Sequence, residues 1–62
     1  MKSLSEQIEA VKREIALRKR VYGRWVVEKR MSEEKAAHEI EAMEGVLATL
    51  QSVQQEQGDL GL

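Results

Sequence analysis

Two runs of apolar residues, each spaced alternately by four and three positions, constrain this sequence more than any other feature. The first run consists of Leu4, Ile8, Val11, Ile15, Tyr22 and Trp25. The second run consists of Ala36, Ile40, Met43, Leu47 and Leu50. This spacing places apolar side chains along one stripe of an α-helix. The chain contains no proline, so the sequence predicts an all-α protein with two long helices.

The boundaries of these helices follow from capping residues. Ser3 or Ser5 can cap a first helix over about residues 4–29, which we expect to continue through Gly23. Ser32, followed by two glutamates, is a typical N-cap for a second helix over about residues 33–57. We expect Gly58 to act as the C-cap. One domain, 1–57, with a flexible tail over 58–62, is the predicted organisation.

A turn this short joins helices only as an antiparallel hairpin, in which facing positions have numbers that add up to about 62. The apolar arc of each helix is wider than one partner can cover, because Leu17 and Val21 extend the first and Val46 and Val53 extend the second. A domain of this size buries only about 60% of its unfolded surface. The chain has no cysteine to form a disulfide, so we expect it to dimerise into a four-helix bundle.

One polar pair interrupts the predicted core. Arg18 occupies the vacant place between Ile15 and Tyr22, and Glu39 lies at a level that its guanidinium can reach. Such a pair adds little stability but can determine register and oligomeric state. The predicted core and dimer residues are Leu4, Ile8, Val11, Ile15, Arg18, Glu39, Ile40, Met43, Leu47 and Leu50.

The charge is unevenly divided along the chain. Residues 1–31 contain nine Lys or Arg and four Glu, a balance of +5, whereas residues 32–62 have a balance of −6. This asymmetry favours packing of the first half against the second. The basic face of the first helix has two interpretations: a surface for RNA or DNA phosphates, using Arg13, Lys19, Arg20 and Arg24, or a solvated face balanced by helix-spaced glutamates.

Tyr22 and Trp25, with Arg24 between them, form the only aromatic cluster of the chain. Tyr, Trp and Arg dominate protein interaction hot spots. Alternatively, Trp25 closes the core of the hairpin at its turn, opposite Ala36. The candidate partner-binding residues are Tyr22, Arg24, Trp25, Arg20, Leu17 and Arg13.

The remaining residues argue against catalysis. His38 is the single histidine, and no nucleophile, base and orienting group can be assembled around it. We therefore expect a protein that is not an enzyme and that uses no metal, cofactor or small-molecule substrate. No apolar run reaches the about 18 residues that a membrane span requires, and no secretory signal is recognisable. The predicted location is the cytoplasm.

Three segments carry a resemblance to a known family. Val21-Tyr22-Gly23-Arg24-Trp25-Val26, the turn Lys29-Arg30-Met31-Ser32, and the Ile40 to Glu44 segment of the second helix resemble small helical proteins of temperate phages and prophages that share a V-Y-x-R-W-V motif. Gly23 stands where many of those proteins have proline. The resemblance implies a phage accessory protein that inhibits or modulates a host protein, such as a transcriptional regulator or a defence complex, with Tyr22, Arg24 and Trp25 as contact positions.

Overall fold

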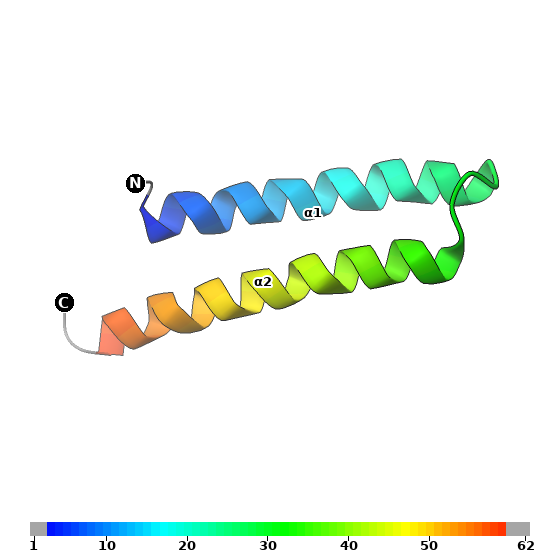
Figure 1. Ribbon diagram of the computed structural model, residues 1–62. Helices are drawn as coiled ribbons and strands as arrows, with labels where there is room; N and C mark the ends of the chain where they lie inside the picture. Colours follow the sequence, from blue (N-terminus) through cyan, green and yellow to red (C-terminus); the bar gives the residue numbers. More distant parts are fainter. Residues whose placement is uncertain (1–2, 60–62) are drawn as a thin grey trace.

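The computed structural model of the protein describes residues 3–59, which form two helices joined by a short turn. Helix α1 spans Leu4–Val27 and helix α2 spans Glu33–Asp59. The two helices run antiparallel, side by side (Figure 1). The molecule measures 49 × 18 × 15 Å, so it is two helices wide and one helix thick. The prediction of an all-α chain with two helices is confirmed.

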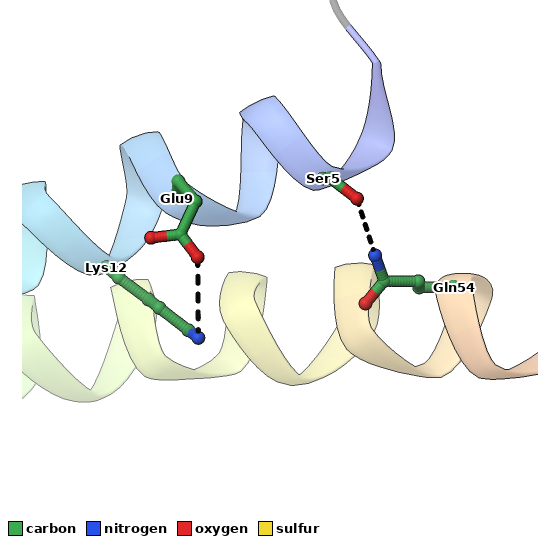
Figure 2. Close-up of polar contacts among 4 residues, drawn as sticks. All are labelled: Ser5, Glu9, Lys12 and Gln54. Atoms are coloured by element: carbon green, nitrogen blue, oxygen red, sulfur yellow. Dashed lines mark hydrogen bonds and ion pairs between the residues drawn. The ribbon is translucent and has the colours of Figure 1, made fainter.

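Ser3 is the N-cap of α1. Its hydroxyl accepts a hydrogen bond from the Glu6 amide at 3.1 Å, and the Glu6 carboxylate accepts one from the Ser3 amide at 3.3 Å. This reciprocal capping box satisfies two of the amide groups that a helix start leaves without partners. The other candidate cap, Ser5, has a different function: its hydroxyl accepts a hydrogen bond from the Gln54 side chain of α2 at 3.0 Å (Figure 2).

Helix α1 ends at Val27, two residues before the predicted end. Lys29 adopts a left-handed backbone conformation with φ of 61°. Its amide donates to the Val26 carbonyl at 3.0 Å, and the Arg30 amide donates to the Trp25 carbonyl at 2.8 Å. These two hydrogen bonds define a Schellman motif, which usually has glycine at the left-handed position. This ending was not predicted from the sequence, because lysine instead of glycine occupies the left-handed position.

Ser32 caps α2 as predicted: its hydroxyl accepts from the Lys35 amide at 3.1 Å and its carbonyl from the Ala36 amide at 3.1 Å. At the other end the prediction is wrong, since α2 continues to Asp59 and Gly58 lies inside the helix. Residues 60–62 of the expected tail lie outside the described residues.

Two contacts between the helices report the register. The Lys19 ammonium lies 3.6 Å from the Glu44 carboxylate, and Ser5 pairs with Gln54. The numbers of these pairs add up to 63 and 59, which agrees with the predicted value of about 62. The two helices therefore keep this register from the open end of the hairpin to its middle.

The core between the helices is thin. Within the described residues only Ile8, Ile15 and Ala36 are buried apolar side chains. The other predicted core positions are half-buried, including Arg18 and Glu39; the apolar members of this group are Leu4, Val11, Ile40, Met43, Leu47 and Leu50. A side chain at Gly23 would meet nothing within 4 Å, so α1 passes through this glycine without a packing requirement for it.

Replacing Lys29 tests the origin of the turn. We expect Lys29→Gly to raise the free energy of unfolding by about 1 kcal/mol, because glycine adopts the left-handed conformation without the steric cost of a Cβ. Urea denaturation followed by circular dichroism, at one fixed protein concentration, measures this change. The matched control Lys29→Ala retains the Cβ and should leave stability nearly unchanged; an equal gain from alanine would contradict the assignment.

Candidate functional site

The aromatic residues near the turn form a small stacked cluster. The rings of Tyr22 and Trp25 are tilted by 33° with centroids 5.8 Å apart, and both side chains are half-buried. The Arg30 guanidinium lies over the Trp25 ring, 5.6 Å from its centroid. The Schellman motif explains this contact, because it brings the residue after the left-handed position against the third residue from the helix end. Arg30 is therefore a member of the cluster that sequence reasoning missed.

Arg24 and Val27 point away from this aromatic cluster. Successive helical residues are rotated by about 100°, so Arg24 lies away from the ring of its neighbour Trp25, and the predicted trio of Tyr22, Arg24 and Trp25 is divided between two surfaces. Val27 is 82% exposed. Its position could have been recognised from spacing, since it continues a four-three series. We call this series the outer stripe of α1: Arg13, Leu17, Arg20, Arg24 and Val27.

The three arginines of the outer stripe have no ion-pair partner among residues 3–59. Other cations of the first half do: Lys12 lies 3.8 Å from Glu9, and Arg30 lies 3.4 Å from Glu28. The interpretation of a balanced, solvated basic face therefore describes the paired cations. It does not describe the outer stripe, whose arginines are exposed and available.

The expected contact between Arg18 and Glu39 is not formed in the hairpin. The Arg18 Nε donates to the Glu14 carboxylate at 2.8 Å, and Glu39 pairs instead with Lys35 at 3.5 Å. Both contacts join residues four positions apart on one helix, where partners are neighbours regardless of the second helix. The hydrogen bond to Glu14 is the largest influence on the pKa of Arg18, which is raised, with desolvation opposing it. The core charge pair is thus replaced by two pairs within the helices.

One broad side of the hairpin carries exposed apolar side chains. Leu17, Val46 and Val53 are 43%, 45% and 39% exposed. From the contact seam, Val21 on α1 and Val46 and Val53 on α2 are rotated in the same sense, and antiparallel helices bring such positions to one side. Leu17 lies about 180° from the seam residue Ile8, so it stands at the margin between this side and the outer stripe. Lys19 and Glu44, rotated in the opposite sense, pair on the other side. We call this surface the apolar face: Leu17, Val21, Val46 and Val53.

A shallow hollow borders the apolar face on α2. Its lining residues follow the spacing of one helical surface patch and are Ala42, Gly45, Val46, Thr49 and Leu50. Nothing lies within 4 Å of the position that a Gly45 side chain would take. Because glycine has no side chain, the hollow is open to the exterior of the hairpin. The packing of α2 against α1 does not require glycine at this position.

The described residues contain no group of three or more His, Cys, Asp or Glu side chains placed to hold a metal ion, and His38 is exposed. Over the same range, neither helix has an apolar stretch long enough to cross a membrane. No protein-family model, curated protein or solved structure matches the chain. The site is accordingly defined by the geometry of its own residues.

Replacing Arg30 tests the aromatic cluster. Arg30→Ala removes the cation over Trp25 and should lower the free energy of unfolding by about 0.5–1 kcal/mol, the usual strength of such a contact at an exposed site. Trp25 is the single tryptophan, so its fluorescence emission should shift to longer wavelength as the ring becomes more hydrated. The control Arg24→Ala should leave the emission unchanged, and a shift of equal size there would contradict the assigned contact.

Proposed function

We propose that this protein is a non-enzymatic interaction module that acts by binding another protein. The observation that carries this proposal is the large share of apolar surface left uncovered by the hairpin. Among the side chains that the structure describes, only Ile8, Ile15 and Ala36 are buried apolar ones, whereas Leu17, Val46 and Val53 are exposed along one side of the hairpin and Val27 is exposed on the outer stripe. Monomeric soluble proteins rarely leave contiguous apolar surface open unless it serves as a binding site.

The first part of the proposal is a homodimer, a four-helix bundle formed through the apolar face. A twofold axis lets the same patch of each copy cover the other. The hollow beside Gly45 resembles the hole between four residues that receives a side-chain knob in coiled-coil packing. Val53, exposed on the same face, is a suitable knob.

The second part is a contact with a host protein at the turn end of the hairpin. Tyr22 and Trp25 provide aromatic area, and Arg30 covers one ring. Arg24 and Val27 are exposed at the same end of α1 but on a different surface. Aromatic and arginine side chains of this kind concentrate binding energy in small interfaces. Together with the resemblance to small phage proteins, this supports an inhibitor or modulator of a bacterial host protein, such as a transcriptional regulator or a defence complex.

The alternative function is binding of RNA or DNA through the basic side of α1. It is favoured by the unpaired state of Arg13, Arg20 and Arg24. Two observations weigh against it: Lys19 is engaged by Glu44, and exposed Leu17 and Val27 alternate with the arginines. Apolar side chains at these positions have no partner on a phosphate backbone.

The dimer is tested by placing a charge on the apolar face. Sedimentation equilibrium of the unmodified protein at micromolar concentration in about 1 M salt, which screens charged contacts, should report about 14 kDa, twice the chain mass of 7.1 kDa. Val46→Glu should give 7.1 kDa, because a buried, unpaired carboxylate is strongly unfavourable. Ala37→Glu, an exposed position on the side of α2 opposite Val46, is the matched control and should remain dimeric. A monomeric unmodified protein would refute this part.

The host contact is tested by capture from a bacterial lysate with tagged protein. Tyr22→Ala should reduce the retained host protein at least about tenfold, in the range of an interface hot spot. Tyr22→Phe keeps the ring and should retain most of the binding. Nucleic-acid binding predicts a different result: affinity that falls steeply with salt and is lost on replacing Arg13, Arg20 and Arg24 while tolerating Tyr22→Ala. Retention that is equal for all variants would reject both functions.

A further inference from the structure

The charged side chains that lack a partner are strictly divided between the two helices. Among residues 3–59, the unpaired cations all belong to α1 or to the turn after it: Arg13, Arg20, Arg24 and Lys29. The unpaired carboxylates all belong to α2: Glu33, Glu34, Glu41 and Glu56. Few of the opposite charges on the two helices therefore pair with each other inside the hairpin, where Lys19 and Glu44 form an ion pair between the helices.

These charges lie on opposite narrow edges of the molecule. At about 100° per residue, Arg13, Arg20 and Arg24 point away from α2, because they lie roughly opposite the seam residues Ile8 and Ile15 on the helical circumference. The same count places Glu34, Glu41 and Glu56 on the side of α2 that faces away from α1. The hairpin is a single layer of two helices lying side by side (Figure 1). One edge, on α1, carries the three unpaired arginines beside Glu6 and Glu28, which have partners of their own. We call it the cationic edge, and we call the opposite edge, on α2, the acidic edge.

We propose that the cationic edge of α1 binds the acidic edge of α2 in a second copy of this chain. The charges are complementary in sign and similar in number, and each set is exposed. The net charge of −1 means that copies do not repel each other as a whole. Hairpins associate side by side through this contact, with α1 of one copy against α2 of the next.

The shapes of the two edges also match. The outer stripe of α1 interleaves its arginines with the larger apolar residues Leu17 and Val27. The acidic edge of α2 carries small residues at the four-three spacing, namely Gly45, Ala48 and Ser52, between its glutamates. Large side chains on one helix packed against small ones on the other allow the helices to approach closely, so that the charges at the margins can pair.

This contact differs in kind from the proposed face-to-face dimer. The dimer uses the same patch of both copies, whereas the edge contact joins two different patches. A contact between different patches leaves one free edge of each type at the ends and extends beyond two copies unless it closes into a ring. Edge association is electrostatic and should weaken with salt, while the apolar dimer should persist.

Sedimentation equilibrium at two salt concentrations separates the contacts. At about 10 mM salt, where charges act over about 30 Å, the weight-average mass of the unmodified protein should rise at least about twofold above that of the dimer with increasing concentration. At about 1 M salt, with a screening length of about 3 Å, the mass should return to that of the dimer. If the mass at about 1 M salt instead falls to that of the monomer, the salt-sensitive edge contact is supported and the apolar dimer is rejected.

Reversing each edge provides the decisive comparison. Arg20→Glu with Arg24→Glu makes both edges acidic, and Glu34→Arg with Glu41→Arg makes both edges basic. Each variant alone should lose the low-salt association. An equimolar mixture should recover it, because each basic edge then meets an acidic one. Lys12→Glu with Lys35→Glu changes the net charge as much as the first variant at positions outside the outer stripe and should still associate.

Three results would overturn the inference. The first is a low-salt mass that stays at the dimer value, and the second is a mixture no larger than its separate components. The third is low-salt association that Arg20→Gln with Arg24→Gln, a milder pair that preserves helix propensity, leaves intact while circular dichroism shows a folded protein. If Arg20→Gln with Arg24→Gln instead loses a captured host protein while its self-association is unchanged, the cationic edge binds an acidic surface of that protein and not a second copy of this chain.

Discussion

The single seam between α1 and α2 is the constraint on which the rest of the structure depends. Each helix contributes one apolar stripe, and two stripes can bury only the side chains that point directly at the partner: Ile8, Ile15 and Ala36. The residues beside them, such as Val11 and Leu47, are half-buried because nothing covers their outer sides. A hairpin therefore cannot enclose a core, and its wide apolar arcs necessarily become surface.

The turn links this packing to the candidate binding end. Ending α1 at Val27 with Lys29 in a left-handed conformation reverses the chain within five residues, before Ser32 starts α2. The same hydrogen bonds place Arg30 over Trp25. The backbone motif that closes the hairpin thus also builds the aromatic and cationic cluster.

The polar contacts show why long charged side chains rarely bridge the helices. Arg18 and Lys35 each have a glutamate four positions away on their own helix, and these partners are within reach without tertiary structure. Within residues 3–59, the polar side-chain contacts between the helices are those of Lys19 with Glu44 and of Ser5 with Gln54. The remaining arginines and glutamates point outward, where their opposite signs form the two charged edges. Local pairing thus leaves the long-range charge asymmetry available for other molecules.

Much of this fold could be read from the sequence because its determinants are local. Heptad spacing, the Ser3 and Ser32 caps and the short turn specify two antiparallel helices and their register without knowledge of any distant contact. The end of α1 could not be predicted, since the left-handed backbone conformation of Lys29 is unfavourable for a residue with a Cβ. It is stabilised by the hydrogen bonds that close the turn. The partners of Arg18 and Glu39 could not be predicted either, because charged residues on the same helix compete with those on the facing helix for each ion pair. The sequence by itself determined which residues are helical and which stripes are apolar or charged. Only the tertiary structure decided which of those stripes remain exposed, because a side chain is covered only where the surface of one helix contacts that of the other along their single seam.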